Sequence, residues 1–300
     1  MTLEARASAG AVELAYEAFG APADPPVLLI MGLGTQMIAW PDEFCARLAA
    51  DGRFVVRFDN RDAGRSTHLH DAPEPDVRAA FAGDTSSASY TLSDMAADGV
   101  GLLDALGLDG AHVVGASMGG MIAQALAIEH PSRVRSLTSI MSTTGDRWVG
   151  GPTEAALGVL LAPPPRSRED AVERAVAAQR VIGSPGFALD EAAIRERAGL
   201  AYDRGYDAKG VARQLLAVLA SPDRTPRLGG VRVPTLVLHG AEDPLVDVSG
   251  GRATAAAIAG AELVVIPGMG HDLPRQAWPQ IVARIGALVD RAERGRGRGG

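Results

Sequence analysis

The chain has 300 residues, 47% of them hydrophobic, and a formal net charge of −7 at pH 7. This length and composition are typical of one large core, alone or with a small insertion. The acidic balance argues against a nucleic-acid partner, which needs clustered basic residues, and does not favour an anionic membrane surface.

Targeting segments are not evident in the sequence. No run approaches the ~18 apolar residues of a membrane-spanning helix. The first twenty residues contain charged side chains where a signal peptide has an apolar region. Cys45 is the single cysteine, so no internal disulfide can form. We therefore expect a cytoplasmic protein without a membrane span.

Strand and helix patterns alternate through the first third of the chain. The first predicted helix has Pro41 at its start and Gly52 at its end. The second starts with a capping-box pattern formed by Thr91 and Asp94. The predicted order is a strand or hairpin arm over 12–19, a strand over 27–31, a helix over 41–51, a strand over 54–58 and a helix over 91–106. This alternation predicts an α/β fold with a mostly parallel sheet.

Ser117 lies in the motif Gly115-Ala116-Ser117-Met118-Gly119, between an apolar run over 111–114 and a stretch with helical periodicity. In such a strand-to-helix elbow the serine occupies a strained turn that exposes its hydroxyl at the end of the strand. The flanking glycines are needed because a side chain there collides with neighbouring backbone. The motif predicts that Ser117 is a nucleophile.

A serine nucleophile needs a base, and the base needs an acid that fixes its tautomer. The buried strand predicted over 235–240 is followed by Asp243, the candidate acid. The strand predicted over 262–266 is followed by His271, the candidate base. The sequence therefore predicts a Ser117-His271-Asp243 triad, with each residue just beyond a strand.

The turn Gly32-Leu33-Gly34 follows the apolar run over 27–30 and can direct a backbone N–H into the cleft. Leu33 supplies this first oxyanion-binding N–H. Met118 supplies the second, to which the helix dipole adds partial positive charge. A dinucleotide-binding turn is the alternative, and it fails because Met37 stands where the third glycine belongs.

Residues 143–221 have a different pattern, with several prolines and three predicted amphipathic helices over 169–181, 190–202 and 211–220. A helical insertion after the strand predicted over 134–141 covers the edge of the sheet where open α/β sheets bind ligands. We expect this segment to shape the pocket and to contribute little to the chemistry. Its candidate pocket-lining aromatic residues are Trp148, Phe187, Tyr202 and Tyr206.

The stretch over 57–66 matches the D-x-R-G-x-G-x-S turn of α/β-hydrolases, except that Asp62 replaces the usual glycine. From Val12 to about Val289 the chain resembles a serine hydrolase of that superfamily, in which the triad also runs in the order Ser, Asp, His. The motifs over 40–44, 115–119 and 266–271 resemble the aclacinomycin methylesterase group and related actinobacterial lipase or carboxylesterase-like proteins.

The resemblance implies an α/β-hydrolase fold, with helices on both faces of a mostly parallel sheet and a helical cap. The core is expected over 1–142 and 222–290, the cap over 143–221 and a disordered tail over 291–300. Asp243 stands three residues beyond Gly240, the family's spacing for the acid, and is preferred to Glu242 and Asp272. Substrate binding is assigned to the following residues: Gly32, Trp40, Trp148 and Tyr206.

The predicted function is hydrolysis of a small-molecule carboxylic ester through an acyl-enzyme, without a cofactor. Thioester hydrolysis, C–C cleavage and perhydrolysis on the same triad stay open, as does a non-catalytic binding protein of this fold. A metal site at His68, His70 and Asp71 is not favoured because a further partner at ligand spacing is missing. A homodimer stays an open alternative.

Overall fold

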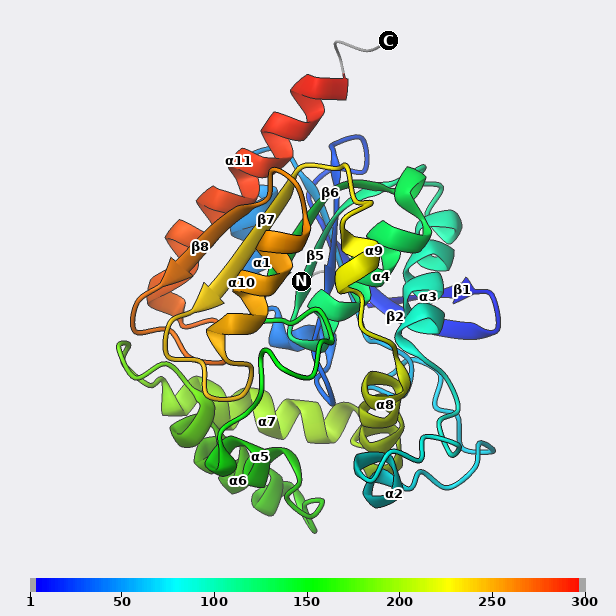
Figure 1. The fold of residues 1–300 in the computed structure, drawn as a ribbon, viewed down its shortest axis with the longest axis vertical. Helices are drawn as coiled ribbons and strands as arrows, with labels where there is room; N and C mark the ends of the chain where they lie inside the picture. Colours follow the sequence, from blue (N-terminus) through cyan, green and yellow to red (C-terminus); the bar gives the residue numbers. More distant parts are fainter. Residues whose placement is uncertain (1–3, 297–300) are drawn as a thin grey trace.

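The computed structural model describes residues 4–296 as an eight-stranded sheet covered by helices on both faces (Figure 1). The strand order across the sheet is β1-β2-β4-β3-β5-β6-β7-β8. The first two pairings are antiparallel and the rest are parallel, so the expectation of a mostly parallel sheet is confirmed. The strands are β1 (Ala5–Ala9), β2 (Val12–Phe19), β3 (Pro26–Ile30), β4 (Phe54–Phe58), β5 (Ala111–Ala116), β6 (Val134–Ile140), β7 (Thr235–Gly240) and β8 (Glu262–Ile266).

Alternating side chains of the central strands enter two separate apolar cores. Val27 and Leu29 of β3 face the core that contains Phe44, whereas Leu28 and Ile30 face the core that contains Leu126. This period of two follows from the pleat of a strand. Because both faces of these strands are covered, the runs are apolar throughout, as is typical of parallel sheets.

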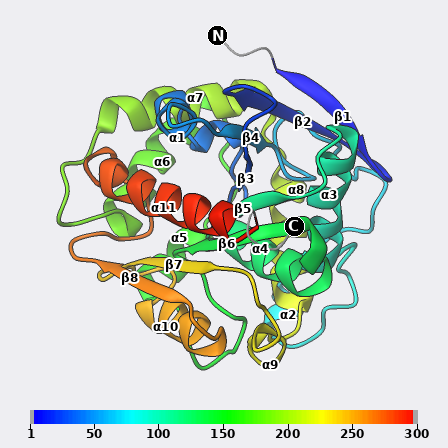
Figure 2. The ribbon, with the colours of Figure 1, turned by 90° about the horizontal axis from the view of Figure 1, so that it is seen from above.

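One face of the sheet is covered by α1 (Asp42–Ala49) and α11 (Trp278–Arg296), and the other by α3 (Leu92–Ala105), α4 (Met118–Glu129) and α10 (Val248–Ala257) (Figure 2). The short helices α2 (Val77–Phe81) and α9 (Thr225–Leu228) lie in connecting segments. Within residues 4–296, no helix combines the length and the apolar character needed to cross a bilayer.

The C-terminal tail differs from the prediction. Residues 291–296 were expected to be disordered, but α11 continues through Arg296. The apolar stripe of the helix extends to Ala292, which is buried, and Glu293 lies 3.2 Å from the buried ring of His112. The Arg and Gly content of this segment masked that stripe, while residues 297–300 lie outside the part that the structure describes.

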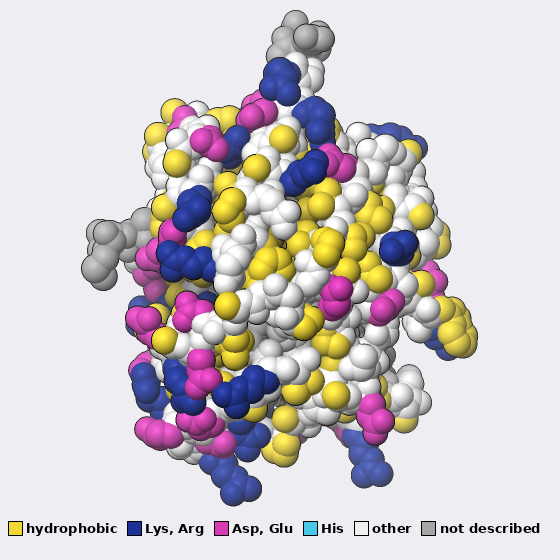
Figure 3. Space-filling view, turned by 90° about the vertical axis from the view of Figure 1, so that its left-hand side faces the viewer, with side chains coloured by type: hydrophobic (Ala, Val, Ile, Leu, Met, Phe, Trp, Pro, Cys, Tyr) yellow, Lys and Arg dark blue, Asp and Glu magenta, His cyan; other side chains and the backbone are white. Residues whose placement is uncertain are grey.

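The predicted helical insertion is confirmed as α6 (Arg168–Ile182), α7 (Glu191–Gly205) and α8 (Ala208–Ala220), which lie beneath the carboxyl ends of the parallel strands (Figure 1). An additional helix, α5 (Glu154–Leu160), begins at Thr153, whose hydroxyl caps the Ala156 N–H. We call α5 to α8 and their connections the cap. Acidic and basic side chains alternate over the end of the molecule where the cap lies (Figure 3).

A buried ion pair attaches α8 to the core. Asp62, the residue that replaces the usual glycine, adopts φ +63°, a region that Asp tolerates better than most residues. Its carboxylate accepts hydrogen bonds of 2.7 and 2.8 Å from the Arg213 guanidinium and one of 2.8 Å from the Tyr90 hydroxyl. Both ionic side chains are inaccessible to solvent, at 0% and 1% exposure. The departure from the family motif therefore supplies an anchor for the cap.

Removing one partner of this pair should be costly. Arg213→Met leaves the Asp62 carboxylate buried without its countercharge, and we expect a loss of about 3–5 kcal/mol in the free energy of unfolding, measured with urea. The double variant Asp62→Gly with Arg213→Met restores the family's usual glycine and removes the unpaired charge. It should be more stable than Arg213→Met, and a lower stability for the double variant would contradict this assignment.

Candidate active site

Ser117 occupies a sharp turn between β5 and α4, with φ 57° and ψ −123°. The turn has no space for flanking side chains: a Cβ at Gly115 would lie 2.0 Å from the Gly119 carbonyl oxygen, and a Cβ at Gly119 would lie 2.1 Å from that of Ile30. The positive φ is unfavourable for serine and is maintained by this packing, with the Ser117 N–H bonded to the Ile140 carbonyl at 2.9 Å.

The structure brings the three predicted triad side chains into contact. The Ser117 hydroxyl lies 2.9 Å from Nε2 of His271, and Nδ1 of His271 lies 2.8 Å from Oδ2 of Asp243. Since a carboxylate can only accept, Nδ1 carries the proton and Nε2 is free to accept the hydroxyl proton of serine. The arrangement can deliver an activated serine oxygen.

Asp243 is held in one orientation by four neighbours. Its Oδ1 accepts the N–H groups of Leu245 and Val246, both at 2.9 Å, while Nε2 of His239 lies 3.5 Å from Oδ2. Burial opposes ionisation of the carboxyl, but the hydrogen bonds of His239 and His271 outweigh it and lower its pKa to about 2. Asp243 is therefore a permanent anion beside the His271 ring at ordinary pH.

The two rival acids are occupied elsewhere. Glu242 accepts the Gly268 N–H at 2.6 Å, and Asp272 accepts hydrogen bonds from Ser184 and Gln179. Neither carboxylate hydrogen-bonds to the ring of His271 in the described part of the chain. Of the three candidate acids, Asp243 is therefore the one whose carboxylate contacts the imidazole.

The predicted oxyanion turn lies against the nucleophile. A Cβ added to Gly32 would approach the Ser117 Cβ to 3.0 Å, so a side chain there would press against the nucleophile. Gly34 donates its N–H to the side chain of Gln214 from α8 at 2.8 Å, whereas the Leu33 N–H has no partner within residues 4–296. Met118 is the first residue of α4, where N–H groups lack partners inside the helix.

A cleft of about 1690 Å³ separates the cap from the carboxyl edge of the sheet. Ser117, His271 and Gly32 line it on the core side, and Tyr206 lines it on the cap side. Tyr202 stacks on Tyr206 with ring centroids 6.1 Å apart. The other lining side chains are predominantly apolar, including Ile38, Met121, Leu157, Val159, Phe187, Ile194, Leu215 and Leu245. The cleft is larger than the roughly 300–1,000 Å³ of common ligand pockets.

Two of the predicted substrate-binding residues lie elsewhere. Trp40 is fully buried in the core, with its ring centroid 5.4 Å from that of Phe44, and does not line the cleft. Trp148 is 82% exposed to solvent and points away from the cleft that its neighbours Arg147 and Val149 line. The motif around Trp40 and the aromatic character of Trp148 suggested a place in substrate binding. Neither signal indicates the direction in which the side chain points.

Three guanidinium groups that line the cleft lack an ionic partner in the described structure: Arg147 is exposed to solvent, whereas Arg197 and Arg224 are half-buried and buried. Arg197 of α7 makes no hydrogen bond to residues 4–296, and burial lowers its pKa although Asp272 and Asp190 oppose the shift. Arg224 is buried and bonds only neutral acceptors, including the side chain of Gln124 at 3.1 Å, and burial lowers its pKa to about 10. The cleft therefore combines apolar walls with guanidinium groups that no carboxylate pairs within residues 4–296.

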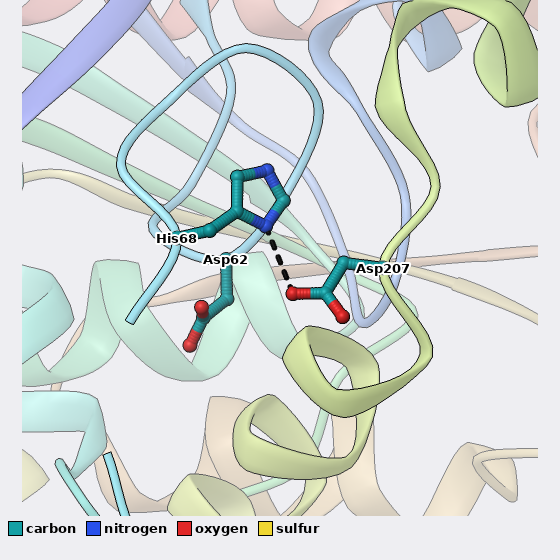
Figure 4. Close-up of side chains that lie close together, drawn as sticks. All are labelled: Asp62, His68 and Asp207. Atoms are coloured by element: carbon teal, nitrogen blue, oxygen red, sulfur yellow. Dashed lines mark hydrogen bonds and ion pairs between the residues drawn. The ribbon is translucent and has the colours of Figure 1, made fainter. Parts of the chain in front are cut away.

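Among residues 4–296, Asp62, His68 and Asp207 form the cluster with potential metal-binding geometry, with ligand atoms within 4.8 Å of one another (Figure 4). Nδ1 of His68 lies 3.0 Å from Asp207, and Nε2 lies 3.0 Å from the Gly64 carbonyl. Arg213 donates to both carboxylates of this cluster, so a guanidinium already supplies the positive charge there. We assign the cluster to attachment of the cap.

Several groups that support the site are not predicted from the sequence. His239 donates from Nε2 to the Val246 carbonyl at 2.7 Å and contacts Asp243, whereas Gln214 holds the oxyanion turn. The apolar run before Asp243 predicts that His239 lies in a buried strand, but its contact with the Asp243 carboxylate is evident only from the fold. Nothing in the local sequence of α8 signals the role of Gln214.

The chain is similar to known proteins over most of its length. A family model described as alpha/beta hydrolase fold matches residues 25–274. Rhodomycin D methylesterase DnrP from Streptomyces peucetius is 32% identical over 293 residues, which cover 91% of this chain and 94% of that protein. 3-Oxoadipate enol-lactonase 2 from Acinetobacter baylyi is 29% identical over 243 residues, 80% of each chain.

Solved structures agree on the fold. The enol-lactonase from Burkholderia xenovorans is similar with a TM-score of 0.74 at 24% identity, covering 95% of this chain and 100% of that one. A thermophilic esterase from Thermogutta terrifontis has a TM-score of 0.69 at 24% identity, covering 97% and 99%. The resemblance predicted from the sequence motifs is thereby confirmed, and the chain belongs to the alpha/beta-hydrolase fold family.

Proposed function

We propose that this hydrolase cleaves carboxylic esters through an acyl-enzyme on Ser117. The observation that carries the proposal is the continuous hydrogen-bonded series from the Ser117 hydroxyl through His271 to Asp243 at the wall of the cleft. Serine at the elbow argues against the members of this fold that use an aspartate there, because a carboxylate forms a different covalent intermediate. The reaction needs water and no cofactor.

The chemistry follows from the positions of these groups. Ser117 attacks the ester carbonyl while Nε2 of His271 takes its proton, and Asp243 stabilises the imidazolium that forms. The N–H groups of Leu33 and Met118 bind the oxyanion of the tetrahedral intermediate, where preorganised donors are worth about 3–4 kcal/mol each. His271 then protonates the leaving alcohol and activates water for deacylation.

The substrate class that fits best is a methyl ester of a bulky, multi-ring acid. A cleft of about 1690 Å³ with predominantly apolar walls has room for several fused rings. The guanidinium groups of Arg197 and Arg224, which have no ionic partner within residues 4–296, favour carbonyl or hydroxyl oxygens on those rings. The proposal is also supported by the relatives at 32% and 33% identity, which are named rhodomycin D methylesterases.

Turnover of an ester panel tests the function. We expect hydrolysis of p-nitrophenyl esters and of an aromatic polyketide methyl ester, and loss of about four to six orders of magnitude in kcat for Ser117→Ala with its fold retained. Thioesters and a C–C cleavage substrate belong in the same panel. Activity of the wild type on one of those classes alone would assign the triad to that reaction, and binding without turnover would leave a ligand-binding protein.

The pKa of Asp243 predicts how stability depends on pH. Its value of about 2 lies below the usual one, so the carboxylate is ionised above pH ~4 and its stabilising contribution is lost only as the pH falls toward 2. The contribution of this carboxylate to the free energy of unfolding should therefore be constant above pH ~4 and decline between pH 4 and 2. Urea unfolding of the wild type and of Asp243→Asn across this range checks the prediction, and a stability difference between the two proteins that is already lost at pH 5 would contradict it.

Tyr206 of the cap and Trp148, which precedes α5, predict a contrast in specificity. Tyr206 lines the cleft, so Tyr206→Ala should change the ratio of kcat/KM between a bulky ester and an acetate ester by roughly 1–3 kcal/mol. Trp148 is exposed outside the cleft, and Trp148→Ala is the matched control with an unchanged ratio. Equal effects of the two substitutions would show that the cap does not shape substrate binding through Tyr206.

A further inference from the structure

The loop that carries His271 lies directly on the connection between α6 and α7. The backbone N–H of His271 donates to the Ile182 carbonyl at 2.7 Å, and the Gly186 N–H donates to the Gly268 carbonyl at 2.8 Å. Residues 182–186 belong to the cap, and residues 267–272 follow β8 in the core. The two segments therefore pair through their backbones beside the predicted base.

Glycines allow this close approach. A Cβ at Gly186 would lie 2.4 Å from the Cα of Gly268, and a Cβ at Gly270 would lie 2.2 Å from the Gly183 carbonyl oxygen. Gly268 also has φ +75°, which favours glycine. Any side chain at these positions would force residues 267–272, which we call the base loop, away from residues 182–186 of the cap.

Two side chains complete the contact. The Ser184 hydroxyl donates to Oδ1 of Asp272 and accepts the Gly270 N–H at 2.9 Å, which uses both capacities of a hydroxyl. Gln179 of α6 donates to Oδ2 of Asp272 at 2.6 Å. Asp272 is thereby bound to the cap by both carboxylate oxygens, one residue beyond His271.

The backbone of residues 267–272 bonds to the core at the beginning of the loop. Glu242 accepts the Gly268 N–H at 2.6 Å, and its own N–H donates to the Met269 carbonyl at 3.0 Å. At Gly270 and His271 the backbone N–H groups instead donate to the cap, because both have acceptors in residues 182–184. The peptide that carries the imidazole is thus oriented by the cap rather than by the sheet.

We propose that the cap connection over 182–186 positions the base of the reaction, with Ser184 and Asp272 as positioning residues. This inference rests on the proposed function of the triad and extends it, because the cap then contributes to the chemistry as well as to the shape of the cleft. It departs from the expectation that the cap contributes little to the chemistry. Displacement of a reacting group by about 1 Å can lower a rate by roughly 100-fold.

Ser184→Ala is the primary test, because it removes both hydroxyl contacts and creates little space. We expect kcat for p-nitrophenyl acetate, and the rate of phosphonylation of Ser117 by a small fluorophosphonate, to fall by roughly 10- to 100-fold. KM should stay within about threefold, since a change in the position of the base acts on the chemical step rather than on binding of the ester. Ser184→Thr keeps the hydroxyl and should restore most of the rate, and Asp272→Ala should give the same pattern of loss.

Ser167→Ala is the matched control, since Ser167 caps α6 through the Asp170 N–H and lies away from the base loop. It should retain the wild-type kcat even where it lowers the melting temperature. The proposal would be overturned if Ser184→Ala impaired only bulky esters through KM, which indicates direct substrate contact, or if both serine variants lost activity in step with stability. A wild-type protein without turnover would instead refute the proposed function, so the two failures are distinguishable.

Discussion

The strained turn at Ser117 is the constraint on which the rest of the site depends. Its φ of 57° exposes the hydroxyl above the sheet only because Gly115 and Gly119 let β5, α4 and β3 approach without side chains. The same packing sets the first turn of α4 beside the Gly32 turn, so the nucleophile and the two candidate oxyanion donors share one rigid element. A site built on strand ends and a helix start is held more tightly than one built on free loops.

The cap is joined to the core at several points close to the reacting groups. Gln214 bonds the oxyanion turn, Arg213 pairs with Asp62, and Arg204 pairs with the buried Asp59 at 2.7 Å. Together with the proposed positioning of the base loop, these contacts link the shape of the cleft to the geometry of the reacting groups. A change in the cap that alters substrate binding can therefore also alter the rate of the chemical step.

Local signals in the sequence were sufficient for much of this architecture. The elbow motif, and the order of Ser117, Asp243 and His271 after apolar runs, identified three residues that the fold brings into contact. These signals work because each residue is placed by its own strand. The side chains of Trp40 and Trp148 were misplaced because the motif and the composition carry no information about direction, and α11 extends past Arg291 on an apolar stripe hidden among arginines and glycines.

The contacts between the cap and the base loop were beyond the reach of the sequence. Ser184 lies 86 residues from Gly270 and 88 from Asp272, in a glycine-containing connection without a recognisable motif. From the sequence, Asp272 is only a rival candidate for the acid, because its position beside His271 does not indicate that its carboxylate faces the cap. Such pairings depend on the mutual placement of two segments that only the complete fold determines.

Covalent trapping of the intermediate tests the central claim most directly. The wild-type protein would be mixed with p-nitrophenyl butyrate, quenched in acid within the first turnover and digested, and the acylated peptide identified by mass spectrometry. Our account predicts a transient butyryl group on Ser117 that disappears as substrate is exhausted. Ester turnover with Ser117 unmodified at every quench time, or with the acyl group on another residue, would contradict it.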